Sequence, residues 1–499
     1  MNLLPLFVIA PLGLAFLLPV LTRLWKGFPS WIGNIATAFL TGLSFWVIQY
    51  AAETKTFAVG GWSLANNIPI GIIMVMDGLT VLMLLVVNFI GFMATLFSVN
   101  YMEHYTDKGK YFTLFLLMIA GLNGVVLAGD LFNLFVFLEI TAIASYSLVA
   151  FGVGAEELEA SFKYQVLGGT ASAFILLGIA FFYHATGTLN LADATNVIAG
   201  KSGSPEILFI GTLFLVGFAL KAALMPFHAW LPDAHPSAPA PISAMLSGVV
   251  IKVLGVYTLI RLFFNVFGVD TIVSFKEILL FLGILSMVVG GFLALGQKDF
   301  KRLLAYSSIS QIGYVIFALG IGSSLAILGA LFYLISHAVF KSLLFLNSGA
   351  VVYATDSRDL NKLGGLYQKM PVTTTTAMVG SLSISGLPPM GGFWGKLVII
   401  LAAIEAGHHI LAGIAVLISI VTLAYYLKVL RMVYFGVLKK AFQNIREVPF
   451  LMCFSMIVLA ILSIGLGILL LPQVRDILLG PAVQVVENGI DYAKVVLGG

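Results

Sequence analysis

The stretch GFALKAALMPFHAWLPDAHPSAPAPISAMLSG (217–248) decides the fold, because prolines repeatedly interrupt a strongly apolar sequence there. The prolines are Pro226, Pro232, Pro236, Pro239 and Pro241. Proline removes a backbone donor and breaks the helical hydrogen-bond ladder. Backbone opened at membrane depth is tolerated only against protein or water. The stretch therefore predicts a broken membrane helix in the interior of a bundle.

The composition of the whole chain also indicates a membrane protein. Of its 499 residues, 60% are apolar and 10% are charged, and the mean hydropathy is +1.06. A soluble domain carries about 25% charged residues, so this chain cannot cover a water-facing surface. Its apolar runs are continuous rather than alternating, which favours helices over a barrel. The first run is followed, not preceded, by basic residues and is expected to be a membrane helix rather than a cleaved signal.

Since a bilayer core needs about 20 apolar residues per helix, the sequence predicts an all-α integral membrane protein of about 14 transmembrane helices. The predicted helices lie near 3–22, 31–50, 78–98, 111–128, 131–152, 162–184, 206–225, 241–264, 277–295, 303–321, 324–352, 372–404, 410–435 and 451–471. The polar stretches between them are too short for a soluble domain.

A second break, SLSISGLPPMGGFWGK (381–396), contains Pro388 and Pro389 and a glycine pair. Two interrupted helices five helices apart predict an inverted five-helix repeat, an arrangement common in transporters. The predicted division is helices 1–3 in residues 1–105, the first repeat (helices 4–8) in 106–265, the second repeat (helices 9–13) in 266–436, and helix 14 with a tail in 437–499.

Loop lysines and arginines predict the orientation in the membrane. One side carries Arg23, Lys26, Lys108, Lys110, Lys298, Lys301, Arg302, Arg358, Lys362, Lys369, Arg431, Lys439, Lys440 and Arg446. The other side carries only Lys55, Lys201, Lys276, Arg475 and Lys494. Because the basic side faces the cytoplasm, we expect a multi-pass protein of the cell (inner) membrane with both termini outside.

Ionisable residues inside the predicted helices are the candidate functional residues. Glu139 lies in mid-helix, where insertion scales assign roughly 2.5–3.5 kcal/mol to Asp, Lys or Arg. A single residue of this kind is either functional or a neutral carboxyl satisfied by a neighbour. Lys221, Lys252, Lys341 and Lys396 add four more such groups, spread over both predicted repeats. Together they favour a chain of proton-exchanging groups over a structural accident.

A glutamate–lysine pair can act as a switch. Burial brings both residue types closer to exchanging protons near neutral pH. When such a pair is closed, both groups hold their charge; when it opens, the lysine loses its counter-ion and its proton becomes mobile.

Three histidines could take part. His337 shares a helix face with Lys341 at a spacing of four; alone it would be read as a hydrogen-bonded core histidine, but beside Lys341 a relay is favoured. His228 and His235 flank the first break, and a proton entry and an ordinary interfacial position are equal alternatives for them. Their spacing of seven, with no cysteine nearby, does not indicate a metal site.

Other residues are expected to be structural. Asp77 should cap a helix, Cys453 should be a buried apolar residue, and Lys163 should either snorkel to the interface or tune Glu139. The chain lacks a phosphate-binding loop, a GxGxxG turn, and CxxC, GxSxG and HExxH motifs. We therefore expect no cofactor, no metal and no catalytic redox site, and any redox reaction would belong to a partner.

Five motifs carry a family resemblance. They are DLFNLFVFLE (130–139), FALKAALMPFHAWLPDAHPSAPAPISAMLSGVVIK (218–252), KDFKRLLAYSSISQIGY (298–314), SHAVFKSLLFLNSG (336–349) and SGLPPMGGFWGK (385–396). The chain resembles the antiporter-like membrane subunits of respiratory complex I, membrane-bound hydrogenases and Mrp-type Na⁺/H⁺ antiporters. The resemblance implies fourteen helices with an inverted repeat. It also implies that Glu139 and Lys221 form the switching pair, that Lys252 and His337 form a central relay, and that Lys396 is the exit-side lysine.

GGW (60–62) and DLFNLFVFLE are most similar to the D-type members of the Mrp antiporters. We therefore expect a proton-translocating subunit of an Mrp-type cation/proton antiporter, with other membrane subunits, the lipid bilayer and protons as partners and no nucleic acid. Passage of Na⁺ through this subunit stays open. The alternatives are a proton-pumping subunit of a membrane-bound hydrogenase or complex I-like enzyme, a stand-alone secondary solute transporter, and a structural scaffold.

Overall fold

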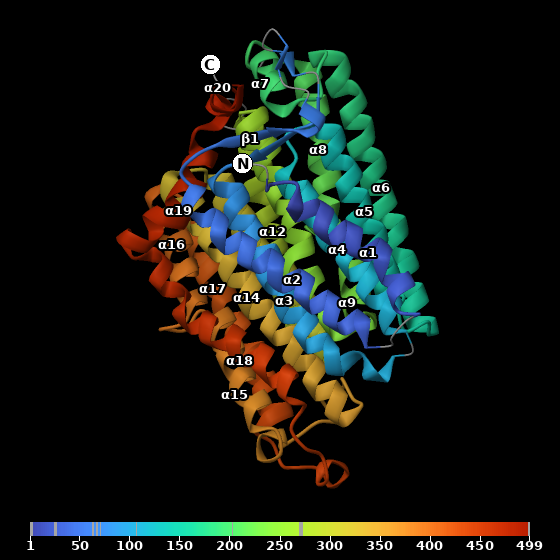
Figure 1. Ribbon diagram of the computed structural model, residues 1–499. Helices are drawn as coiled ribbons and strands as arrows, with labels where there is room; N and C mark the ends of the chain where they lie inside the picture. The colour runs from blue at the N-terminus through green and yellow to red at the C-terminus, as the bar shows by residue number, and fades with distance from the viewer. Residues whose placement is uncertain are drawn as a thin grey trace.

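The computed structural model describes residues 3–23, 27–61, 64–65, 68–69, 71–105, 107–201, 203–268 and 273–497. Lys26 and Trp62, which entered the charge count and the resemblance, lie outside these residues. Strands in the described chain form two short antiparallel pairs, β1 (Lys55–Ala58) with β4 (Ile73–Met76) and β2 (Leu64–Ala65) with β3 (Ile68–Pro69). The rest is mainly helical, which confirms the predicted all-α membrane class. Figure 1 shows one elongated bundle with α7, α20 and the strands near its upper end.

Eleven helices of the described chain are long and apolar enough to cross a membrane. They are 28–50, containing α2 (Phe28–Val47); 78–104, containing α3 (Gly78–Tyr101); α4 (Lys108–Leu127); α5 (Leu131–Val149); α6 (Ala155–Thr186); 240–266, which begins with α10 (Ala240–Met245); α12 (Val273–Gly296); α13 (Phe300–Ile321); α14 (Ser324–Thr355); 409–434, containing α17 (His409–Val429); and 450–470, containing α18 (Phe450–Gly465). Each coincides with a predicted span.

The three other predicted spans fall on shorter helices. These are α1 (Leu6–Leu21), α8 (Pro205–Lys221) and the pair formed by α15 (Pro371–Ser385) and α16 (Gly391–Glu405). The total of fourteen transmembrane helices and the inverted repeat therefore stay predictions. The helices α7 (Leu191–Ala199), α19 (Pro472–Glu487) and α20 (Tyr492–Leu497) lie outside the predicted spans.

Both predicted interruptions are present. The first helix ends at Lys221, four residues before the predicted end, and turns lead to the short α9 (Leu231–Ser237) before α10 begins. The Trp230 indole donates to the Leu220 carbonyl, which returns the chain onto the helix it has just left. The second break lies between α15 and α16, where Gly386 adopts a φ of 78° that favours glycine.

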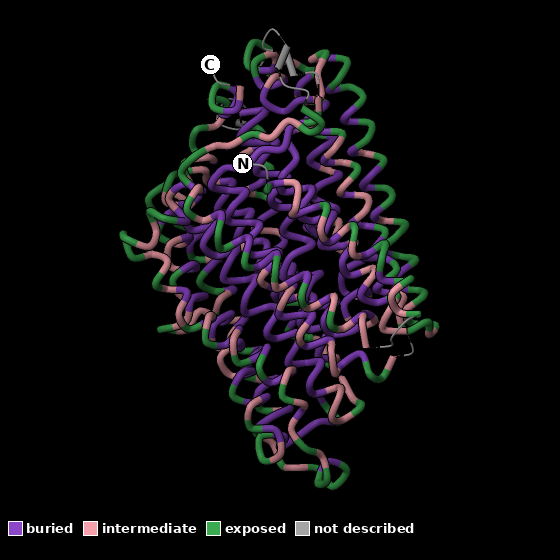
Figure 2. The backbone as a smooth tube through the Cα atoms, viewed as in Figure 1, coloured by how far each residue is buried: buried purple, intermediate pink, exposed green. Residues whose placement is uncertain are grey.

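The helix at 240–266 is irregular over most of its length and is wholly enclosed. It contains π-helical turns at Leu246–Val250, Lys252–Tyr257 and Arg261–Val266. Such turns occur frequently at functional sites. Figure 2 shows the buried interior of the bundle and the exposed outer helices around it. The candidate residues on this helix and on α14 therefore lie deep inside protein.

Helices α12 and α13 pack backbone against backbone through glycines. A Cβ at Gly283 would lie 2.5 Å from the Phe317 nitrogen, and one at Gly313 would lie 2.5 Å from the Met287 nitrogen. Small residues at helix interfaces allow this approach in membranes, where van der Waals contact rather than water exclusion drives association.

We predict that Gly313→Val forces these helices apart. Overpacking costs about 1–3 kcal/mol or more, so the purified protein should melt at a lower temperature in detergent, with less of it assembled. Gly413→Val on α17 is the matched control, because a Cβ there meets nothing within 4 Å. Equal melting temperatures for Gly313→Val and the wild type would contradict this account of the packing.

Candidate functional site

Glu139 and Lys221 meet inside the first half of the bundle. Glu139 Oε1 on α5 lies 3.8 Å from Lys221 Nζ at the end of α8. Ser172 on α6 bridges them, since its hydroxyl donates to Glu139 Oε1 and accepts from Lys221 Nζ at 3.0 Å. Lys221 also donates to the Gly168 carbonyl at 3.1 Å. The lysine is buried, whereas the glutamate side chain is 30% exposed on the flank of the bundle.

Lys252 is held without a carboxylate among the described residues. Its ammonium donates to the Ser247 carbonyl at 2.5 Å, one π-helical turn earlier on the same helix. The Ser247 hydroxyl forms a 2.7 Å hydrogen bond with that of Ser308 on α13. Ser247 thus contacts Lys252 through its carbonyl and α13 through its hydroxyl, and no hydrogen bond joins Lys252 to His337 among the described residues.

A polar network connects α13, α14 and α17 in the second half. Lys341 donates to the Tyr426 hydroxyl at 3.2 Å, and Tyr426 shares a hydrogen bond with Ser307 at 3.0 Å. From Ser307 the network continues through side chains that are all buried. They are Tyr425, Thr422, Gln311 and Tyr333. This network, which sequence reasoning missed, begins at one candidate lysine and returns to α14 one helical turn before His337.

His337 is buried, and neither of its ring nitrogens has a hydrogen-bond partner among the described residues. Its ring lies beside those of Tyr333 and Phe340, at centroid distances of 6.5 and 5.5 Å. A buried polar group of this kind requires a partner, commonly an ordered water. His337 and Lys341 therefore share a face of α14, as predicted, but no hydrogen bond joins them in the described chain.

Lys396 lies on α16, just after the second break. It donates to the Ile384 carbonyl at 2.9 Å and to the Ser419 hydroxyl at 3.2 Å, and it faces the Tyr314 ring at 4.9 Å. It also lines a mainly apolar recess of about 220 Å³ beside the break. The break thus supplies the carbonyl that holds the ammonium, because the last carbonyls of a helix lack intrahelical partners.

The two histidines at the first break lie in different environments. His235 on α9 is fully buried, stacks on Phe345 at 4.5 Å, and has no hydrogen-bond partner on either nitrogen within the described chain. His228 is less enclosed, and its Nδ1 is also without a partner there. No group of three or more His, Cys, Asp or Glu among the described residues could hold a metal ion.

Charged residues hold α9 from outside. Asp233 pairs with Lys163 at 3.0 Å and with Arg302 at 3.3 Å, and Arg358 donates to the Pro236 carbonyl at 3.1 Å. Lys163 therefore pairs at the membrane surface and does not contact Glu139. These residues line a polar cavity of about 350 Å³.

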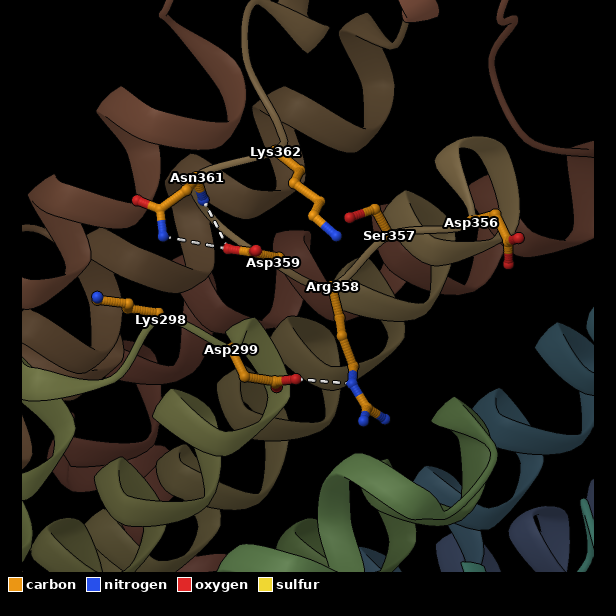
Figure 3. Close-up of a pocket in the computed structure, with 8 residues that line it drawn as sticks. All are labelled: Lys298, Asp299, Asp356, Ser357, Arg358, Asp359, Asn361 and Lys362. Carbon is orange, nitrogen blue, oxygen red and sulfur yellow. Dashed lines mark hydrogen bonds and ion pairs between the residues drawn. The ribbon is translucent and has the colours of Figure 1, made fainter. Parts of the chain in front are cut away.

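Arg358 also joins this cavity to a second one of about 470 Å³, shown in Figure 3, through a 2.7 Å ion pair with Asp299. Burial alone would lower the pKa of Arg358, but the charges of Asp299 and Glu156 raise it above the ordinary value. The guanidinium therefore stays charged.

Sequence reasoning also missed two buried cations. Lys301, expected at the interface, is buried and donates to the Ala238 carbonyl at 2.7 Å. Arg261 lies inside the helix at 240–266 and forms a 2.5 Å ion pair with Asp77. Asp77 also accepts from the Thr80 nitrogen, which confirms its expected role as a helix cap. The ion pair with Arg261 is a second role that was not predicted.

Comparison with known proteins identifies the family of this chain. The family model described as NADH:quinone oxidoreductase/Mrp antiporter, transmembrane, matches residues 128–422. The chain belongs to this family. A second model, the N-terminus of chain 5 of NADH-ubiquinone oxidoreductase (complex I), matches residues 62–112. The resemblance found in the motifs is therefore confirmed.

Relatives come from both branches of the family. The N-type subunit of NADH-quinone oxidoreductase from Desulforudis audaxviator is 34% identical over 98% of this chain and 97% of its own. The D-type subunit of the Na⁺/H⁺ antiporter from Alkalihalophilus pseudofirmus is 34% identical over 87% of this chain and 88% of its own. Two solved structures also align over 99% of both chains, each with a TM-score of 0.89. One is a chain of the Mrp complex from Dietzia sp. DQ12-45-1b, at 26% identity. The other is a chain of a membrane-bound sulfane sulfur reductase, an archaeal respiratory membrane complex, at 32% identity.

We predict that Ser172→Ala weakens the coupling of Glu139 to Lys221. Their direct separation of 3.8 Å is too long for a hydrogen bond, so the serine carries the connection. Loss of about 1–1.5 kcal/mol should reduce proton movement in everted membrane vesicles about tenfold. Thr170→Ala is the matched control, since Thr170 is exposed on the same helix and bonds only the Val166 carbonyl. An equal effect of both substitutions would contradict the bridging role.

Proposed function

We propose that this chain conducts protons across the membrane as the antiporter-like subunit of a multi-subunit Mrp-type cation/proton antiporter. The observation that carries the proposal is the Glu139–Ser172–Lys221 arrangement at the first helix break. It places an acid, a hydroxyl and an amine in line where a membrane helix opens.

The arrangement can move a proton without moving a heavy atom far. Ser172 accepts a hydrogen bond from Lys221 and donates one to Glu139. A proton passing from the lysine to the serine oxygen, while the serine proton passes to the carboxylate, leaves a neutral lysine and a neutral carboxyl. The exchange conserves charge overall, and opening of the pair then separates its two members.

The second half of the chain would continue the path. Lys252, the pair His337 and Lys341, and Lys396 are the proposed further proton-transfer residues, with His228 and His235 as proposed entry residues. The hydroxyls from Tyr426 to Thr422 can pass a proton by rotating, whereas the Gln311 amide beyond them cannot, so the proposed proton route leaves this network before Gln311. The unpartnered nitrogens of His235 and His337 are suitable positions for water to complete the path.

The proposed partners are other membrane subunits, the lipid bilayer and protons, and whether Na⁺ crosses in this chain stays open. The partly exposed Glu139 carboxylate on the flank supports a neighbouring subunit there, because a charge facing lipid is costly. The proposed location is the cell membrane with both termini outside. The positions of Arg302 and Arg358 support this, since both predicted cytoplasmic cations contact α9, through Asp233 and the Pro236 carbonyl.

A redox-driven complex is the second candidate. It is favoured by the relative from NADH-quinone oxidoreductase, which aligns over nearly the whole chain, and by the match to a respiratory sulfane sulfur reductase. The same path would then be driven by electron transfer in a partner. Proton movement coupled to Na⁺ without an electron donor would support the antiporter, and a strict requirement for a donor would support the redox complex.

We predict that Glu139→Gln abolishes proton movement while the complex still assembles, because the amide keeps the shape but cannot take up the proton. Transport should be followed in everted vesicles, with assembly checked by native gel. Glu159→Gln is the matched control, since this exposed carboxylate pairs only with Lys163 at the membrane surface. Full transport by an assembled Glu139→Gln complex would refute the pair as a proton carrier.

A further inference from the structure

The Arg261–Asp77 pair closes the polar interior at the end opposite Arg358. Arg261 is nine residues after Lys252 on the same enclosed helix, roughly 13 Å along it. Asp77 begins α3, which runs from this end toward the end of the bundle where Arg358 lies. Both side chains are buried. The pair therefore lies between the proposed proton path and the second face of the membrane.

The guanidinium is fixed on every side. Its Nη2 bonds Asp77 Oδ1 at 2.5 Å and Thr80 Oγ1 at 2.8 Å, and its Nε donates to the Tyr257 hydroxyl at 3.0 Å. Tyr257 in turn donates to the Val126 carbonyl at the end of α4 at 2.6 Å. The cluster thus joins α3, α4 and the π-helical turn that carries Lys252.

The C-terminal segment covers this cluster. Asn265 donates to the carbonyls of Val485 and Gly489 at 2.7 and 3.3 Å, and the Tyr492 ring lies 5.5 Å from the Arg261 guanidinium carbon. Helix α19 and the turn after it therefore form the outer layer over the pair.

The protein between Lys252 and Arg261 is tightly packed, and its two polar side chains, Tyr257 and Thr258, donate to backbone carbonyls. Val253, Leu254 and Val256 are buried, and a Cβ at Gly255 would lie 2.4 Å from that of Ala222, directly after Lys221. The only described hydrogen bond of the Lys252 ammonium runs the other way, to Ser247. No side-chain hydrogen bond of the described chain continues from Lys252 toward Arg261.

Neither member of the pair is suited to exchange a proton. Arginine does not deprotonate in proteins. Burial alone would raise the pKa of Asp77, but the charge and hydrogen bonds of Arg261, with those of Thr80, lower it below the ordinary value. Asp77 therefore stays a carboxylate and Arg261 a guanidinium, so neither member of the pair can take a proton from the path and pass it on.

We infer that Arg261 and Asp77 form a permanent seal of two groups that do not exchange protons above Lys252, which prevents protons on the path from leaking straight to the far face. Arg261 is a positioning and barrier residue rather than a catalytic one. The inference rests on the proposed proton path but adds a barrier that the path itself does not require.

The test is passive proton leakage in everted vesicles carrying the assembled complex, with no driving ion or electron donor. In Arg261→Lys an imposed pH difference should decay at least five times faster than in wild-type vesicles, because a lysine can release its proton whereas an arginine cannot. The double variant Asp77→Leu/Arg261→Met removes both charges together and keeps apolar packing, which avoids an unpaired buried charge. It should decay at the wild-type rate, because apolar side chains carry no proton either.

Two further variants separate the seal from general loosening. Ser324→Ala removes the hydroxyl that bonds Glu487 of α19 at the same end without touching the pair, and it should not leak. Adding Lys252→Met to Arg261→Lys should stop the leak. A wild-type rate of decay in the assembled Arg261→Lys variant, a leak that persists with Lys252→Met, or an equal leak in the double variant would overturn the seal. Loss of driven transport in Glu139→Gln tests the path separately and is unaffected by either result.

Discussion

The structure depends on how it holds ammonium groups in a region without bulk water. Three buried lysines bond backbone carbonyls at interruptions of the helices: Lys252 bonds that of Ser247, Lys301 that of Ala238, and Lys396 that of Ile384. Each of these carbonyls lies at a π-helical turn or a helix end, where the backbone is not fully used by its own helix. The interruptions in the helices are therefore what allows the cations to be buried.

A carbonyl partner has a different consequence from a carboxylate partner. A carbonyl solvates an ammonium but carries no net charge, so the lysine can lose its proton without leaving a counter-ion behind. Arg261 shows the opposite arrangement, with a carboxylate at 2.5 Å and a head group that keeps its proton. Within one helix, Lys252 is thus held so that it can exchange a proton and Arg261 so that it cannot.

Several features could be predicted because each follows from a local rule. Prolines located the broken helices, apolar length located the spans, and isolated charges at mid-span located Glu139, Lys221 and Lys396. Partners that come from distant helices could not be predicted in this way. Ser172 is one of many serines in apolar helices, and only the fold places it between Glu139 and Lys221. Arg261 lies near the end of a predicted span, where arginines are common, so its position alone did not indicate burial. The π-helical turns around it cannot be recognised from the pattern of apolar residues.

The charge balance of the interior argues that the chain works within an assembly. Among the described residues, Glu139 is the mid-membrane carboxylate, and it pairs with Lys221. Lys252, Lys341 and Lys396 have carbonyl, hydroxyl and aromatic partners but no carboxylate. Three unbalanced cations in one low-dielectric interior repel one another, so protonating all three at once carries a cost that an outside anion would offset. In the proposed path, a proton arriving at one lysine would therefore favour release from another, which would couple distant sites without a large conformational change. A neighbouring subunit that brings a carboxylate to the flank near Lys396 would shift that balance, which gives a partner electrostatic control over the path.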